Sequence, residues 1–401
     1  MSIDYQQYLS KTAIGLEPSG IRKFFDLAAT MDDVISLGVG EPDFITPWNI
    51  RELAIQALRE GQTAYTANAG LLELRQEISN YLYKRFLVEY QPENQIIVTV
   101  GASQSLDLAF RAIINSGDEV LIIEPAFVSY AALVTMAGGV PIRVETSADN
   151  GFKVTPEQIE EVITHKTKAI LLCSPNNPTG TSLNRDELTA IASVVEKHDL
   201  LVVSDEIYAE LTYDQEFTSF AAIPNMYERT ILVNGFSKGF AMTGWRLGFL
   251  AAPQELINVM VKIYQYTTMC APTMLQMGAI EALRNSSEQV EKMRQNYWRR
   301  RNYIVQSLNQ IGLECHTPGG AFYVFPSIKK SGLTSEEFAH GLLQQEKVAV
   351  VPGNAFGASG EGYIRCSYAA SIEQIEIAMN RIARYMESLA RTENAALEIA
   401  K

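Results

Sequence analysis

The chain has 401 residues, of which 47% are hydrophobic, and this is enough to bury a sizeable core and to form two domains. A net charge of −13 disfavours nucleic acid or an anionic membrane surface as a partner. No apolar run is long enough to cross a bilayer, and the first residues do not resemble a signal peptide. Four cysteines and four histidines are widely scattered, which argues against a metal site. We therefore expect a cytoplasmic protein with reduced thiols.

The first part of the chain predicts an arm followed by short elements. Residues 1–32 are mixed in character, and an apolar run at Val34–Val39 predicts a strand that ends in a turn at Gly40. Helical periodicity follows at Trp48–Arg59 and Leu71–Phe86, with a loop-like stretch around Tyr65 between them.

Between residues 96 and 251, apolar runs alternate with helical patterns. The runs that predict strands are Ile96–Val100, Val120–Ile123, Val140–Val144, Ala169–Cys173, Leu200–Ser204, Ile231–Asn234 and Leu247–Ala251. The predicted helices are Ser103–Asn115, Phe127–Ala137, Pro156–Thr164 and Asn184–His198. This order predicts an α/β fold whose mostly parallel sheet is covered by helices on both faces. Ligands bind such sheets beyond the carboxyl ends of the strands.

After Pro272 the pattern changes to long helices and short strands. A charged helix at Ser286–Leu308 is interpreted as a solvated bridge between domains. Strands are predicted at Phe322–Phe325, Val348–Val351 and Tyr363–Ser367, helices at Ser335–Gln345 and Ile372–Met386, and a frayed tail at Arg391–Lys401. We expect a large domain at 46–285 and a smaller α+β domain formed by 1–45 and 286–401.

The stretch 234–249 reads Asn-Gly-Phe-Ser-Lys-Gly-Phe-Ala-Met-Thr-Gly-Trp-Arg-Leu-Gly-Phe and holds the main candidate for chemistry, Lys238. A lysine in apolar surroundings has a lowered pKa and can act as a nucleophile or a base. A surface lysine is the ordinary alternative, but four glycines in the stretch indicate a close approach of the backbone to another group.

Two further stretches predict anion binding. Gly101, Ala102 and Ser103 stand where a strand turns into a helix, and a helix N-terminus attracts phosphate. The alternative is that Ser103 only caps the helix. Arg365 lies in a predicted strand, where a buried arginine requires an anion, either a ligand or a salt-bridge partner within the small domain.

Three more candidates follow predicted strands. Asn177 lies in Ser174-Pro-Asn-Asn-Pro-Thr-Gly180, which is also compatible with a rigid turn. Asp205 could be a helix cap, and Phe127 could be a core residue. Tyr208 follows Asp205 by three positions.

These motifs in this order resemble the class I/II aminotransferases, which are pyridoxal-phosphate (PLP) enzymes of fold type I. The form Ser-Lys-x-x-x-Met-Thr-Gly-Trp-Arg-x-Gly around Lys238 is specific, and the resemblance covers residues 14–388. It implies a fold-type-I architecture, with PLP bound to Lys238 as a Schiff base. It also implies a homodimer with shared active sites, because Tyr65 matches a tyrosine that reaches the phosphate of the neighbouring subunit.

The resemblance also assigns roles to the other candidates. Asp205 would face the pyridine nitrogen of PLP, Asn177 and Tyr208 its phenolic oxygen, and Phe127 its ring face. The phosphate would be bound by Arg246 and by the turn Gly101-Ala102-Ser103. The substrate carboxylate would be bound by Arg365, Asn177 and Gly40. The side-chain pocket is expected to include Ile14–Ile21.

The implied reaction is amino transfer between an L-amino acid, aromatic or of broad range, and a 2-oxo acid. A PLP-dependent lyase shares all of these cofactor residues and is the alternative. Many relatives have a phosphate-binding serine three positions before the lysine, where this chain has Gly235. Whether Ser237 takes over that contact is left open.

Overall fold

The computed structural model describes residues 3–16 and 31–399, with only the backbone course given for 392–399. Its centre is a seven-stranded sheet with the strand order β2-β8-β7-β6-β5-β3-β4. All strands of this sheet run in one direction except β8, which is antiparallel to both of its neighbours. The strands are β2 (Ile96–Thr99), β3 (Glu119–Glu124), β4 (Val140–Glu145), β5 (Thr167–Cys173), β6 (Leu201–Asp205), β7 (Thr230–Gly235) and β8 (Gly248–Ala251). The predicted α/β sheet is thus confirmed.

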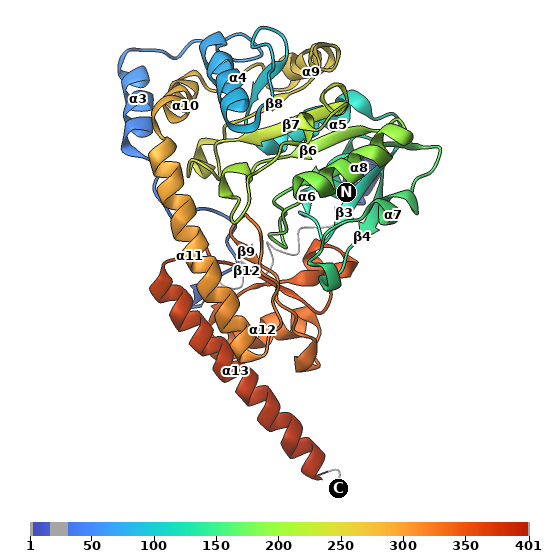
Figure 1. Ribbon diagram of the computed structural model, residues 1–401, viewed down its shortest axis with the longest axis vertical. Helices are drawn as coiled ribbons and strands as arrows, with labels where there is room; N and C mark the ends of the chain where they lie inside the picture. Colours follow the sequence, from blue (N-terminus) through green and yellow to red (C-terminus); the bar gives the residue numbers. More distant parts are fainter. Residues whose placement is uncertain (1–2, 17–30, 400–401) are drawn as a thin grey trace.

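Helices cover both faces of this sheet (Figure 1). Successive residues of a strand point to opposite faces, so Val203 packs with one helix group and Val202 with another. The helices on the first face are α5 (Ala102–Ile113), α6 (Ser129–Met136) and α9 (Gln254–Thr267). Those on the second face are α4 (Leu72–Phe86), α8 (Arg185–Lys197) and α10 (Thr273–Asn285), with α3 (Trp48–Arg59) packed on α10.

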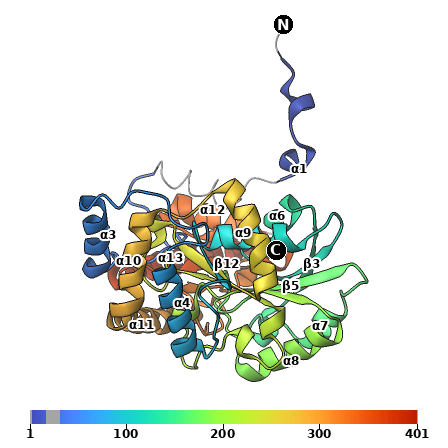
Figure 2. The same cartoon turned by 90° about the horizontal axis from the view of Figure 1, so that it is seen from above.

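A second group of elements lies below the large sheet in Figure 1. It contains the three-stranded sheet β11-β12-β9 and the parallel pair β1-β10. Its elements are β1 (Ile35–Ser36), β9 (Tyr323–Val324), α12 (Ser335–Glu346), β10 (Val348–Ala349), β11 (Val351–Pro352), β12 (Ile364–Ser367) and α13 (Ile372–Ile399). The β1-β10 pair joins the beginning of the chain to its last quarter. Helix α1 (Lys11–Ile14) lies in a segment that extends away from the body (Figure 2).

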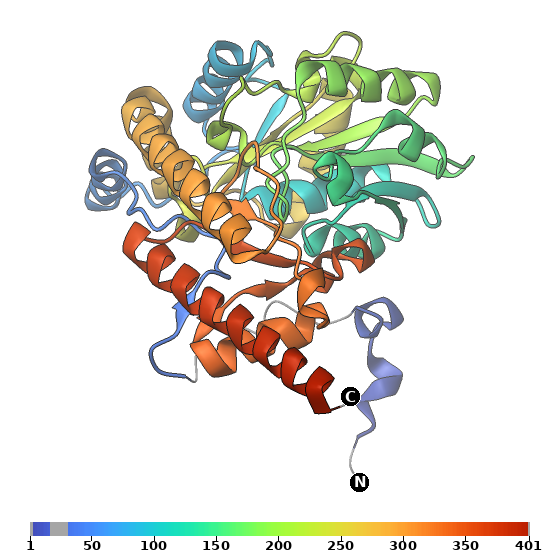
Figure 3. The same ribbon diagram turned by 60° about the horizontal axis from the view of Figure 1, so that its bottom comes forward.

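Helix α11 (Ser287–Ile311) connects the two groups and lies beside α13 (Figure 3). Its first turn contributes Val290 to the core beneath the large sheet, and Tyr297 and Leu308 belong to the core around the small one. The interpretation as a solvated bridge is therefore corrected, because one full face of this helix is buried.

Three other predictions need correction. The sequence patterns do not predict helices α9 and α10, and Pro272, where the pattern changes, is the N-cap of α10. The predicted helix at Pro156–Thr164 stops at Glu160 as α7 (Pro156–Glu160), where the hydrogen bonding changes to turns. The expected frayed tail is helical through Ile399.

Candidate active site

A cavity of about 310 Å³ lies at the carboxyl ends of the strands of the large sheet. Ten of the twelve predicted site residues line it: Gly40, Ala102, Ser103, Phe127, Asn177, Asp205, Tyr208, Lys238, Arg246 and Arg365. Gly101 lies directly behind Arg246. Tyr65 does not line the cavity either. Most of the expected wall segment Ile14–Ile21 lies outside the described residues.

Lys238 enters the cavity from a turn that follows β7. Phe236, Phe240 and Met242 are buried in the core beside this turn and anchor it, so that Ser237 and Lys238 face the cavity. The Lys238 amine donates a hydrogen bond of 2.6 Å to the carbonyl oxygen of Gly40. Burial and the nearby positive charge of Arg365 lower the pKa of Lys238 to about 8. An amine with this pKa can give and take a proton near neutral pH.

Asp205 is the last residue of β6, and its carboxylate is fixed by two donors. The Tyr130 hydroxyl donates to Oδ2 at 2.7 Å, and the backbone N–H of Ile207 donates to Oδ1 at 3.2 Å. Burial raises the pKa of Asp205 to about 6, and the hydrogen bond from Tyr130 opposes this shift. The carboxylate is therefore ionised at neutral pH.

Arg365 lies at the centre of β12, between Ile364 and Cys366, which both point into the core. Its own side chain, on the other face of the strand, is 3% exposed. One guanidinium nitrogen donates to Asn177 Oδ1 at 2.8 Å and another to Gly38 O at 2.7 Å. The third, Nε, has no hydrogen-bond partner among the described residues. The alternative of a salt bridge within the small domain is not met among the described residues, and the guanidinium keeps N–H groups that none of them accepts.

Arg246 has a different environment, because its side chain is exposed at the mouth of the cavity. Its backbone is in the left-handed region at φ 49°, and Nη1 donates to Thr243 O at 3.1 Å. Gly101 supports the guanidinium from behind, since a Cβ there would lie 2.6 Å from Nη2. Gly101 is also the N-cap of α5, so Ser103 is a residue of the first turn and not the cap. The free N–H groups of α5 and Arg246 thus border the same part of the cavity.

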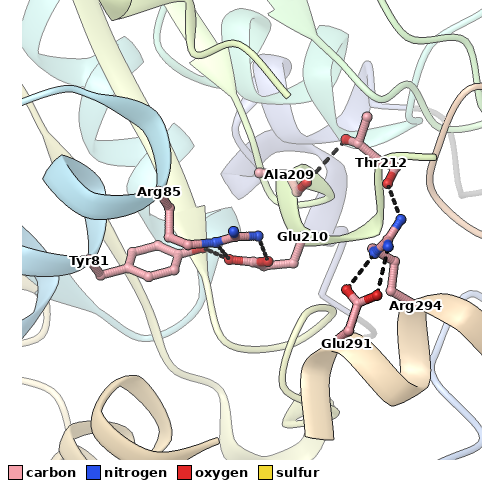
Figure 4. Close-up of polar contacts among 7 residues, drawn as sticks. All are labelled: Tyr81, Arg85, Ala209, Glu210, Thr212, Glu291 and Arg294. Atoms are coloured by element: carbon pink, nitrogen blue, oxygen red, sulfur yellow. Dashed lines mark hydrogen bonds and ion pairs between the residues drawn. The ribbon is translucent and has the colours of Figure 1, made fainter. Parts of the chain in front are cut away.

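The turn that contains Tyr208 is held by contacts that continue beyond the cavity, and those of Glu210 are shown in Figure 4. Its hydroxyl lies 3.0 Å from the hydroxyl of Tyr323. Two residues later, the buried carboxylate of Glu210 accepts hydrogen bonds from Tyr81 at 2.8 Å and from Arg85 at 2.7 Å. These contacts attach the turn after Tyr208 to helix α4. Glu210 also packs against Gly239, where a Cβ would approach its side chain to 3.0 Å. One side chain therefore supports both the Tyr208 turn and the Lys238 turn.

Two glycines of the lysine motif allow close approach of the backbone. Gly235 pairs with Gly248, and a Cβ at Gly235 would lie 2.9 Å from the Cα of Gly248. A Cβ at Gly248 would meet the backbone at the start of α5. The expectation fails at Gly244, which has nothing within 4 Å of its would-be Cβ. Ser237 lines the cavity, so a hydroxyl is present there although position 235 has none.

The sequence did not single out Tyr130 or Tyr323. Tyr130 lies on α6, 75 positions away from the aspartate that it contacts, and no local pattern marks that distance. Tyr323 lies in a strand that was predicted, but a short apolar strand gives no indication of which side chains face a cavity. Both tyrosines reach the cavity through tertiary packing, which no local sequence pattern indicates.

Among the described residues, no group of three or more His, Cys, Asp or Glu side chains is arranged to hold a metal ion. In the same part of the chain, none of the helices is long and apolar enough to span a membrane.

The cavity at the carboxyl edge of the large sheet is thus lined by a lysine, an aspartate and two arginines. The sequence model for "Aminotransferase class I and II" matches residues 32–382, and the chain belongs to this family of enzymes. It is 63% identical over 379 residues to "Putative aminotransferase YugH" of Bacillus subtilis, covering 94% of this chain and 98% of the relative. It is 50% identical over 374 residues to "Aspartate aminotransferase" of Pyrococcus abyssi, covering 92% and 96% of the two chains.

Solved structures agree with this assignment. The crystal structure of an aromatic aminotransferase from Pyrococcus horikoshii superposes with a TM-score of 0.88 at 46% identity, covering 92% of this chain and 99% of that one. The aspartate aminotransferase of Thermus thermophilus with maleate gives a TM-score of 0.90 at 39% identity, covering 94% and 99%. The chain is therefore an aminotransferase, with the α/β architecture of fold type I.

Proposed function

We propose that this aminotransferase uses pyridoxal 5'-phosphate to move an amino group from an L-amino acid, aromatic or of broad range, to a 2-oxo acid. The observation that carries the proposal is that Lys238 and Asp205 line one cavity together with Arg246 and Arg365. An amine, an acidic group and two cations in one cavity match the aldehyde, the ring nitrogen and the phosphate of PLP and the carboxylate of an amino acid.

The residues present fit this cofactor. Arg246, Ser103 and the N-terminus of α5 would hold the phosphate, and the missing Cβ of Gly101 leaves room for the guanidinium that does so. Asp205 would hold the ring nitrogen in its protonated form, because the carboxylate is ionised above its pKa of about 6. Asn177 and Tyr208 would face the phenolic oxygen, and Phe127 the ring.

When bound, PLP supplies an electron sink for the pair left by breaking the Cα–H bond. The chain supplies the rest. Arg365 binds the substrate carboxylate with guanidinium N–H groups that no described residue accepts, and fixes which bond at Cα is presented for cleavage. Lys238, with its pKa near 8, removes the proton from Cα as a general base and returns a proton as a general acid.

The charges of the cavity support an uncharged substrate side chain. Among the described residues that line it, only Lys238, Arg246 and Arg365 carry positive charge, and each already has a role. Ser103, at the cavity wall, offers no charge to a second carboxylate. Relatives are named for aspartate and for aromatic amino acids, so the names alone do not decide this point.

The test is a panel of aromatic amino acids, alanine and aspartate, assayed with 2-oxoglutarate and with pyruvate. We expect product formation that depends on the oxo acid, fastest with aromatic substrates. Release of ammonia or thiol without an oxo acid would instead support the lyase. Aspartate as the fastest substrate would overturn the proposed specificity and leave the amino transfer intact.

We also propose a homodimer in which each chain completes the site of its partner. Tyr65 is 81% exposed, and so is Tyr266 at 86%, which supports burial of this surface by a second copy. Asn68, three positions after Tyr65, donates to Met269 O at 2.8 Å, which places the two exposed tyrosines in neighbouring segments. Mixing Tyr65→Ala chains with Lys238→Ala chains should restore activity, because one site of a mixed dimer then lacks both substitutions. No recovery in a verified mixed dimer would contradict shared sites.

The division into a large domain at 46–285 and a small domain at 1–45 and 286–401 remains our proposal. It is supported by the positions of the sheets, since the seven-stranded sheet lies within 96–251 and the β1-β10 pair joins residues 35–36 to 348–349.

A further inference from the structure

Tyr323 is a cavity residue that has no role in the assignments above. It belongs to β9, opposite Ser367 of β12, and its side chain is 1% exposed. It lines the same cavity as Lys238 and Arg365. A buried tyrosine hydroxyl at a ligand cavity needs a hydrogen-bond partner, and the identity of that partner defines what the residue does.

The hydroxyl of Tyr323 lies between groups that already have roles. It is 3.0 Å from the hydroxyl of Tyr208. It also touches Gly40, since a Cβ there would lie 2.5 Å from the Tyr323 oxygen, and the Gly40 carbonyl accepts the hydrogen bond from Lys238. Any side chain at position 40 would displace this hydroxyl.

The two phenols together have two hydroxyl hydrogens, and the bond between them uses one. Burial raises the pKa of both groups, so both keep their hydrogens at neutral pH. If Tyr323 donates to Tyr208, then the hydrogen of Tyr208 is free for a group in the cavity. When two hydrogen bonds follow one another in this way, the first polarises the second, which makes Tyr208 a stronger donor.

The ring of Tyr323 has a separate contact. Its centroid lies 4.5 Å from the guanidinium carbon of Arg365, and the ring of Phe356 lies at 4.8 Å from the same carbon. Two rings against the guanidinium carbon restrict the orientation of its plane and leave its edge to accept a carboxylate.

We propose that Tyr323 is a positioning residue whose hydroxyl directs the hydrogen of Tyr208 into the cavity and whose ring orients Arg365. This rests on the proposed function, because the group that receives the hydrogen of Tyr208 is the bound cofactor. One residue of the small sheet thereby connects the cofactor contact with the substrate contact.

The test uses the PLP-loaded enzyme and the pH midpoint of its visible absorbance change. Tyr323→Phe removes only the hydroxyl. Tyr208 then becomes a weaker donor, more negative charge stays on the cofactor beside Lys238, and the nitrogen of Lys238 keeps its proton to higher pH. We expect the midpoint to rise by roughly half a unit to one unit while KM for the amino acid changes less than about twofold. In Tyr323→Leu, KM should also rise by about tenfold or more, because the ring over Arg365 is lost.

Two controls separate positioning from a general structural effect. Tyr363→Phe changes a buried tyrosine that stacks on Phe325 and does not line the cavity, and it should leave the midpoint unchanged. In a Tyr208→Phe background, Tyr323→Phe should produce no further shift, because its effect passes through Tyr208.

An unchanged midpoint in Tyr323→Phe, or a full shift that persists without the Tyr208 hydroxyl, would overturn the role of the hydroxyl. A wild-type KM in Tyr323→Leu would overturn the role of the ring. Failure of the proposed function is a distinct result, since the wild-type protein would then show no visible absorbance with PLP at all.

Discussion

The regions around Arg365 and Arg246 both provide an arginine to the same cavity, but they are built in opposite ways. Arg365 lies in a strand, is buried between two rings and has two of its three nitrogens bonded to the protein. Arg246 lies in a turn with positive φ, is exposed, and among the described residues its side chain bonds only to the nearby carbonyl of Thr243. The guanidinium of Arg365 is thus fixed and desolvated, whereas that of Arg246 is solvated.

This difference predicts different contributions to binding. A charge removed from water interacts more strongly with an anion than one that remains hydrated and screened by salt. The Arg365 region is complete within one chain, whereas the Arg246 region is open to solvent and to the second chain that we propose. We therefore expect selectivity to depend on Arg365, and cofactor retention to depend on Arg246 and on assembly.

The largest effect should come from Lys238, whose pKa is lowered in part by the positive charges of both arginines. Lys238→Ala should abolish turnover and the visible absorbance of the PLP-loaded protein, because no other amine lines the cavity in the described chain. Spectra and single-turnover assays measure this loss. Lys292→Ala on the exposed face of α11 is the matched control and should behave as wild type. Near-normal turnover of Lys238→Ala would remove this lysine from its role.

The second effect tests the buried region. Arg365→Gln keeps a hydrogen-bonding side chain but removes the charge, and kcat/KM should fall by roughly a hundredfold to a thousandfold, since losing one partner of a buried charge pair costs about 2–5 kcal/mol. Cofactor affinity should change little. Arg384→Gln, which breaks an exposed ion pair with Glu346, should leave kcat/KM within about twofold. A larger loss of PLP affinity than of kcat/KM would reverse the roles of the two regions.

The third effect tests the exposed region. Arg246→Gln should weaken PLP binding by about 1–2 kcal/mol, or roughly tenfold, because a charge-assisted hydrogen bond at an exposed position is partly screened. The affinity difference between variant and wild type should shrink as salt is raised. Equilibrium dialysis at two ionic strengths measures it. A difference that is independent of salt would mean that Arg246 is buried in the working enzyme.

The smallest effect concerns the pH dependence set by Asp205. Tyr130→Phe removes a donor that lowers the pKa of this carboxylate, so the pKa should rise from about 6. The acid limb of PLP binding by the cofactor-free protein should move up by roughly half a unit, with affinity lost near pH 6 and little changed at pH 8. Tyr264→Phe is the control, since its buried hydroxyl in the same core has no partner among the described residues. An unmoved acid limb would contradict the assignment.

Much of this arrangement follows from local sequence. Continuous apolar runs predicted the strands of the large sheet, and the residues after them had to meet at one edge, so Asn177, Asp205 and Lys238 could be expected together. The antiparallel direction of β8 and the extent of α9 and α10 depend on packing between distant segments and were not predicted.

The same distinction applies to the site. Lys238 and Arg365 stand out because charge in an apolar stretch is unusual. Tyr130 and Tyr323 do not stand out, because a tyrosine is also common in a protein core. Only the tertiary fold places their hydroxyls beside Asp205 and Tyr208. Tyr65 is left exposed by a single chain, and its role remains a prediction.

Helix α11 restricts how the cavity can change its width. It is unbroken from Ser287 to Ile311, with its first turn in the core of the large sheet and the rest in the core of the small one. An α-helix does not stretch, because each turn is closed by hydrogen bonds along its axis. We therefore expect a movement that brings Arg365 closer to Lys238 to roll or tilt the small sheet about this helix, beyond the first turn, which Val290 holds in the core of the large sheet.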